Sequence, residues 1–132
     1  MKKILIILTV LISCLGFSQI DTLNYIKQFE TNKAQYIGKP FSVLLADMKQ
    51  IQPKTVWPLR HGRYKTFILG NSFKFVEMDF SFNNVVTLSI TWQDTIPIEQ
   101  FNYYGKKNNY FFTQDEKLFY GNKIIKNIKV YR

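Results

Sequence analysis

Two carboxylates, Glu77 and Asp79, have a spacing that suits acid–base chemistry. They alternate with apolar residues over positions 76–82, so we expect both on one face of a strand, with side chains about 7 Å apart. Such a pair could supply the acid and base of a small hydrolase, or hold a hard cation. We favour the alternative, that they are the water-facing side of an amphipathic strand, because nothing else marks a site there.

A second candidate site is the basic segment around Gly62, which contains Arg60, His61, Arg63 and Lys65. A loop of this composition could contact an anion. A solvated turn before a strand explains the same residues, and we favour that interpretation. His61 is the only histidine, and no nucleophile motif or zinc-type ligand set accompanies it. We therefore predict neither a metal site nor a cofactor.

Aromatic side chains offer a third possibility. Trp57, Tyr103, Tyr104 and Tyr110 could stack on sugar rings if they are exposed. Aromatic residues of a small domain mostly supply its core, so the core assignment is the one we favour.

Basic residues also gather near the C-terminus. A strand presents one face at every second residue, and lysines spaced by three cannot form a single stripe on it. We therefore interpret them as charges that protect a sheet edge from aggregation, in preference to a polyanion groove. The residues concerned are Lys117, Lys123, Lys126, Lys129 and Arg132.

The first residues have the layout of a secretory signal. Lys2 and Lys3 precede a mostly apolar run over residues 4–15, which is shorter than the roughly 18 residues of a membrane-spanning helix. The small side chains of Gly16 and Ser18 suit signal peptidase. We expect residues 1–18 to be removed, which leaves a single domain over residues 19–132 that begins at Gln19.

A rival processing route involves Cys14. Residues 11–14 resemble the lipobox of bacterial lipoproteins, in which the cysteine becomes a lipid-modified N-terminus. The resemblance implies an outer-membrane lipoprotein, and membrane contact is expected only in that case. We favour simple cleavage into the periplasm or the medium, because the residues after Cys14 are not a polar tether. Cys14 is the only cysteine, so the mature domain cannot form an internal disulfide.

Charge restricts the partners. The 132 residues include 18 Lys and Arg against 9 Asp and Glu, a formal net charge of +9. Removing Lys2 and Lys3 lowers this to about +7 for the mature chain. A positive field attracts anionic polysaccharides and lipid headgroups, and an envelope protein is a further candidate partner. Nucleic acid is disfavoured, since Arg, which dominates base and phosphate recognition, is scarce.

The elements that must position these residues follow from apolar periodicity. Asp21 or Thr22 can cap a helix that ends near Gly38. A second helix from Pro40 to Pro53 has an apolar face in which Phe41, Leu44, Leu45 and Met48 recur at helical spacing.

The period then changes to that of strands. A strand over 64–69 is followed by a turn at Gly70 and Asn71. Residues 76–82 and 86–92 form a predicted hairpin with a three-residue loop, in which Phe80 pairs with Val86 and Met78 with Leu88. In that register Ser89 and Thr87 lie opposite Glu77 and Asp79.

Three further elements complete the chain. Thr95 can cap a short helix that stops at Gly105, residues 113–116 have the form of a capping box, and residues 124–131 form a last strand. The fold class is therefore α+β: N-terminal helices pack on a small antiparallel sheet of about four strands, with a short helix before the last strand.

These observations favour a small exported binding module of the cell envelope that uses one face of its sheet. The alternatives are a hydrolase that depends on Glu77 and Asp79, and an inhibitor of an exported enzyme. We expect such a target enzyme to be acidic, because a basic one would be repelled.

Overall fold

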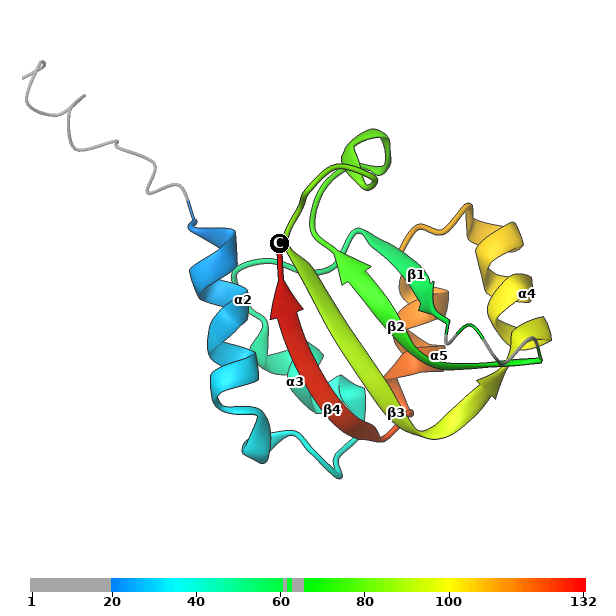
Figure 1. Cartoon of the computed structure of the whole chain (residues 1–132), viewed down its shortest axis with the longest axis horizontal. Coiled ribbons are helices and arrows are strands. Elements are labelled where there is room, and N and C mark those ends of the chain that lie inside the picture. Colours follow the sequence, from blue (N-terminus) through cyan, green and yellow to red (C-terminus); the bar gives the residue numbers. More distant parts are fainter. Residues whose placement is uncertain (1–19, 61, 63–65) are drawn as a thin grey trace, which may run out of the picture.

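The computed structural model describes residues 20–60, 62 and 66–132, in which four α-helices accompany one four-stranded antiparallel sheet (Figure 1). The strands follow one another in the sheet in chain order, and each pairs with the next. They are β1 (Thr55–Leu59), β2 (Phe67–Lys74), β3 (Thr87–Pro97) and β4 (Ile125–Tyr131). The predicted α+β class is confirmed.

The N-terminal helices form where capping and apolar periodicity agree. Asp21 caps α2 (Thr22–Thr31), since its carboxylate accepts the backbone N–H of Asn24 at 3.2 Å. A short 3-10 turn, η1 (Lys33–Gln35), links α2 to α3 (Phe41–Asp47). Pro40 precedes α3 as its N-cap, and α3 ends at Asp47, well before the predicted end at Pro53.

Two helices precede the last strand, α4 (Ile98–Asn108) and α5 (Gln114–Gly121). The predicted capping box of α5 is confirmed, because the backbone N–H of Thr113 donates to Glu116 at 2.9 Å. The predicted bounds of α4 are wrong. Thr95 still belongs to β3, and α4 passes through Gly105 to end at Asn108, followed by Asn109 as a C-cap with a left-handed backbone.

The predicted hairpin over residues 76–92 is also wrong in its first half. Residues 75–86 form a connecting loop with a 3-10 turn, η2 (Met78–Phe80), and β3 pairs with β2 instead. Leu88 lies opposite Phe73, and Ile90 lies opposite Asn71. The alternation that predicted a strand over 76–82 does not reflect burial, since Phe80 is 58% exposed and Phe82 is 77% exposed.

The predicted turn at Gly70 and Asn71 lies inside β2. Gly70 meets a register shift, where β3 comes so close that a Cβ at position 70 would lie 2.0 Å from the carbonyl oxygen of Ile90. Asn71 is buried: its Oδ1 accepts the indole N–H of Trp92 at 2.8 Å. Contacts with β3, which is distant in the sequence, therefore place both residues in the sheet and not in a turn.

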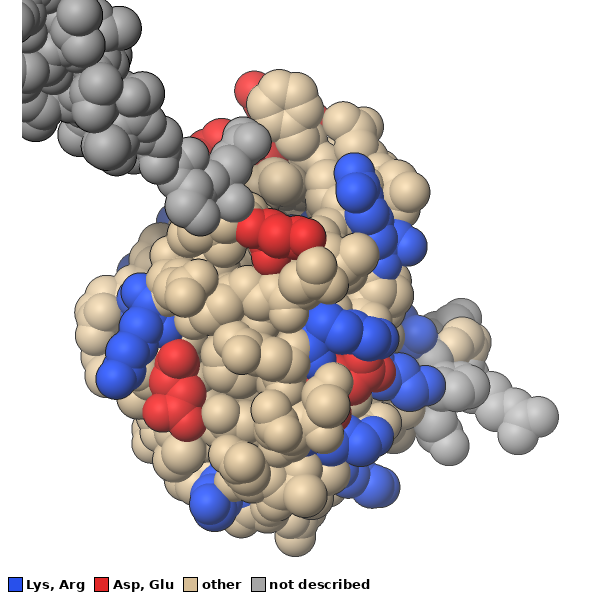
Figure 2. Space-filling view, turned by 90° about the vertical axis from the view of Figure 1, so that its left-hand side faces the viewer, with Lys and Arg blue, Asp and Glu red and all other residues tan. Residues whose placement is uncertain are grey.

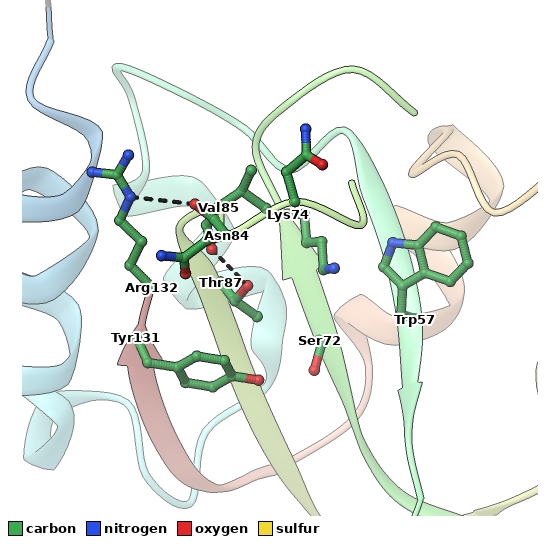
Figure 3. Close-up of a pocket in the computed structure, with 9 residues that line it drawn as sticks. Trp57, Ser72, Lys74, Asn84, Val85, Thr87, Tyr131 and Arg132 are labelled. Carbon is green, nitrogen blue, oxygen red and sulfur yellow. Dashed lines mark hydrogen bonds between the residues drawn. The ribbon is translucent and has the colours of Figure 1, made fainter. Parts of the chain in front are cut away.

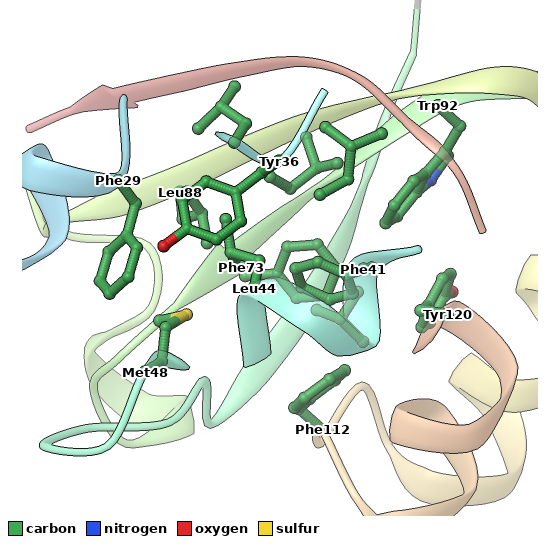
Figure 4. Packing of buried hydrophobic residues seen from close by; sticks show 14 of the residues in the cluster. Phe29, Tyr36, Phe41, Leu44, Met48, Phe73, Leu88, Trp92, Phe112 and Tyr120 are labelled. Carbon is green, nitrogen blue, oxygen red and sulfur yellow. The ribbon is translucent and has the colours of Figure 1, made fainter. Parts of the chain in front are cut away.

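The core lies between the sheet and the helices behind it (Figure 4). Phe41 on α3 is fully buried, with its ring centroid 4.8 Å from that of Phe73 and 5.4 Å from that of Trp92. The ring of Tyr120 on α5 stacks on Trp92 at 6.1 Å. This aromatic packing occupies one face of the sheet.

The opposite face of the sheet carries none of the described helices (Figure 1). Because side chains alternate along a strand, the neighbours of the core residues point to this side. They form cross-strand rows, in which Trp57 pairs with Ser72 and Lys74 pairs with Thr87. Thr87 in turn pairs with Tyr131 on β4. We call this surface the open face.

Candidate functional site

A groove of about 350 Å³ lies on the open face, at the end of the sheet near residues 75–86 (Figure 3). Its floor contains the short side chains of Ser72 and Thr87, which are 8% and 4% exposed. We call it the polar groove. Its lining consists of Trp57, Ser72, Lys74, Asn83, Asn84, Val85, Thr87, Tyr131 and Arg132.

Lys74 projects from β2 into the polar groove (Figure 3). Its ammonium donates to the carbonyl of Ser81, and it lies 5.9 Å from the ring centroids of both Trp57 and Phe82. Partial burial lowers the pKa of Lys74 below its ordinary value, since a desolvated ammonium is less stable in its charged form. Among the described residues, no carboxylate pairs with Lys74.

Trp57 forms one wall of the groove, and its contacts fix the indole. Its Nε1 donates to Thr55 at 3.0 Å, and the ring of Tyr110 stacks on it at 5.0 Å with an interplanar angle of 10°. Tyr110 reaches this position because its carbonyl accepts the backbone N–H of Val56 at 3.0 Å, beside the edge of β1. The sheet thus holds one indole face against Tyr110.

The loop over residues 75–86 forms the rim of the groove. Ser81 is fully buried and its hydroxyl lies 3.3 Å from that of Thr55, which ties the loop to β1. On the other side, the Nε of Arg132 donates to the carbonyl of Asn84 at 3.3 Å (Figure 3). Two cationic side chains, Lys74 and Arg132, therefore flank a rim that supplies amide groups.

The described residues that line the polar groove include no Asp or Glu. Five lining side chains carry hydroxyl or amide groups that both donate and accept hydrogen bonds, and two carry a positive charge. The arrangement can hold an anionic group together with neutral polar groups around it. The side chains in question are Ser72, Asn83, Asn84, Thr87 and Tyr131.

The side of the molecule that α2 occupies has a mixed charge (Figure 1, Figure 2). On the side of the molecule shown in Figure 2, Lys and Arg are interspersed with Asp and Glu among neutral residues. The distinguishing property of the polar groove is local: its described lining includes two cationic side chains and no Asp or Glu.

The structure places Glu77 and Asp79 elsewhere. The predicted strand that would align them is wrong, because Glu77 caps η2 and Asp79 lies within it, and both are exposed. Glu77 forms an ion pair with Lys54. Ser89 and Thr87, the hydroxyl residues expected opposite, lie across from Ser72 and Lys74. A catalytic role for the two carboxylates stays an untested prediction.

The basic segment and the processing sites fall mostly outside the described residues. Arg60 is exposed just after β1. His61, Arg63 and Lys65 lie outside the described residues, as do Cys14 and the predicted signal over residues 1–18.

The remaining aromatic candidates do not join Trp57 as one site. Tyr103 is 60% exposed and contacts Tyr104 on α4, with their ring centroids 5.1 Å apart. Tyr110 stacks on the indole of Trp57 and helps to hold it in place. Trp57 is thus the one sugar-stacking candidate that lines the polar groove.

The C-terminal basic residues do not form a single site either. Lys126 and Lys129 are exposed on β4, and Lys117 and Lys123 are half-buried. The edge of β4 is also covered from α2, where the ammonium of Lys27 donates to the carbonyl of Val130 at 3.0 Å. Arg132 alone of this set lines the polar groove.

No family model, curated protein or solved structure matches this chain. Among residues 20–60, 62 and 66–132, no helix combines the length and the apolar character needed to cross a membrane. The same part of the chain contains no group of three or more His, Cys, Asp or Glu side chains that could hold a metal ion.

The sequence did not predict that Ser72 and Lys74 lie beside Thr87. Their proximity depends on the pairing of β2 with β3. The predicted turn at Gly70 and Asn71 ended the strand before Ser72 and Lys74, and Thr87 was placed opposite Asp79. One signal was present: hydroxyl residues occupy every second position from Thr87 to Thr91, opposite the apolar set of β3.

Proposed function

We propose that this chain is an exported, non-catalytic binding module of the cell envelope, and that its polar groove holds the anionic group of a ligand. Lys74 carries the proposal, because its ammonium is partly desolvated and, among the described residues, has only a carbonyl and two rings as partners. An anion in the groove would supply the opposite charge that this ammonium lacks. Arg132 on the opposite rim would add a second positive charge.

Replacement of Lys74 tests this proposal. We expect Lys74→Met to weaken the binding of dextran sulfate by about tenfold or more, because a charge-assisted hydrogen bond is lost. Titration calorimetry at low and high salt would measure the change. Binding of the unaltered protein should also weaken with salt, and uncharged dextran should not bind.

The matched control is Lys49→Met, which removes the same charge from an exposed position outside the groove. Dextran sulfate should bind this variant nearly as well as the unaltered protein. An equal loss in the two variants would mean that net charge alone attracts the polymer, and the groove would then have no special role.

Export is tested separately, by the intact mass of the protein in soluble and membrane fractions of its host. We expect a soluble chain that begins at Gln19. A lipidated chain that begins at Cys14 would place the module on a membrane instead. A chain that still begins at Met1 would contradict export.

A further inference from the structure

The polar groove has more hydrogen-bonding groups than an isolated anion needs. A small anion such as acetate accepts hydrogen bonds from the protein and donates none, and phosphate donates only through its own protons. Donor groups on the protein are therefore enough to hold such an anion. The groove adds the amides of Asn83 and Asn84, whose carbonyl oxygens accept. A ligand with donating hydroxyl groups as well as an anionic group would use both kinds of lining group.

From these contacts we infer that the groove binds a carboxylated sugar ring, with its carboxylate at Lys74 and its ring against Trp57. The inference rests on the proposed function and names the ligand class for the same site. Hydroxyl groups around such a ring would meet the amides of the rim and the hydroxyls of Ser72 and Thr87 on the floor.

Trp57 supplies the surface for the ring. Tyr110 stacks on one face of the indole and the ring of Phe82 contacts it at a centroid distance of 5.1 Å, so a ligand meets the part of the indole that lines the groove. The C–H groups of a sugar carry partial positive charge and pack on the electron-rich face of an aromatic ring. The hydrogen bond to Thr55 and the stacking on Tyr110 hold the indole in place, so little side-chain entropy is lost on binding.

The dimensions of the groove agree with one sugar unit. Its volume of about 350 Å³ is near the small end of ligand pockets. The short side chains of Ser72 and Thr87 keep the floor low between Trp57 on β1 and Tyr131 on β4 (Figure 3). Lys74 stands between Trp57 and Thr87 along this floor, so one ring can contact the indole and present its carboxylate to the ammonium.

The test uses three probes that separate ring from charge: glucuronate, glucose and acetate. We expect glucuronate to bind at least tenfold more tightly than either glucose or acetate, as measured from amide chemical shifts in NMR titrations. Equal affinity for acetate and glucuronate would overturn the contact with a sugar ring, but it would leave the proposal of an anion-binding groove in place. Equal affinity for glucose and glucuronate would overturn the carboxylate contact. Absence of glucuronate binding overturns the inference, whereas the proposed function is judged by the dextran sulfate titration of Lys74→Met.

Trp57→Leu should lower the affinity for glucuronate to that for acetate, with the affinity for acetate unchanged. The matched control is Tyr103→Leu, which removes an exposed aromatic ring from α4, and it should bind glucuronate normally.

If Trp57→Leu does not fold, the tryptophan fluorescence of the unaltered protein tests the same contact. Glucuronate, but not acetate, should change the emission of Trp57, because Trp92 is buried at 2% exposure. An unchanged emission would contradict contact with Trp57.

Discussion

Gly70→Ala is expected to destabilise the fold by about 3 kcal/mol, in the range of strongly overpacked sites. The added Cβ would lie 2.0 Å from the carbonyl oxygen of Ile90 and 2.9 Å from the Cα of Thr91. Both are backbone atoms of β3, so no side-chain rotation can relieve the clash. Separating the strands would break the ladder that aligns Ser72 and Lys74 with β3. Thermal unfolding should show a midpoint about 10 °C lower.

Gly62→Ala is the matched control, because a Cβ at position 62 meets no atom of the described residues within 4 Å. We expect its stability to stay within about 0.5 kcal/mol of the unaltered protein. If both variants unfold at the normal temperature, then β3 does not approach β2 as closely as described, and the floor of the polar groove would differ as well.

Local signals in the sequence predicted a large part of the fold. The cap at Asp21, the capping box at Thr113 and the alternation of Ile128 and Val130 in β4 each depend on residues close together in the chain. Their structure was predicted correctly for that reason. The overall α+β class follows from the same elements.

Signals that depend on distant residues were misread. Gly70 and Asn71 are typical turn residues, but here a glycine gives room to the backbone of β3 and Asn71 satisfies the indole of Trp92. Each of these two residues is explained by its contact with a residue of β3 about 20 positions further along the chain. No local sequence pattern reveals such a contact. The polar groove was missed with them, because Lys74 and Thr87 become neighbours only through this pairing.

Phe41→Ala should destabilise the protein by about 4 kcal/mol, as is usual for large-to-small substitutions at buried aromatic positions. Phe41 is fully buried, and its ring contacts those of Phe73, Trp92 and Phe112 at centroid distances of 4.8, 5.4 and 6.5 Å. Truncation therefore leaves a cavity between α3 and the sheet. Urea denaturation with an unchanged m-value would measure the loss.

Phe80→Ala is the comparison that separates the predicted hairpin from the observed loop. Phe80 would face the core if residues 76–82 formed a strand, and its truncation would then cost several kcal/mol, as at Phe41. In the structure Phe80 lies in η2 and is 58% exposed, so we expect a change within about 0.5 kcal/mol. A loss of stability comparable to that of Phe41→Ala would indicate that residues 76–82 form a strand of the sheet. It would also restore Glu77 and Asp79 to one strand face, and with them the geometry on which a carboxylate-dependent hydrolase relies.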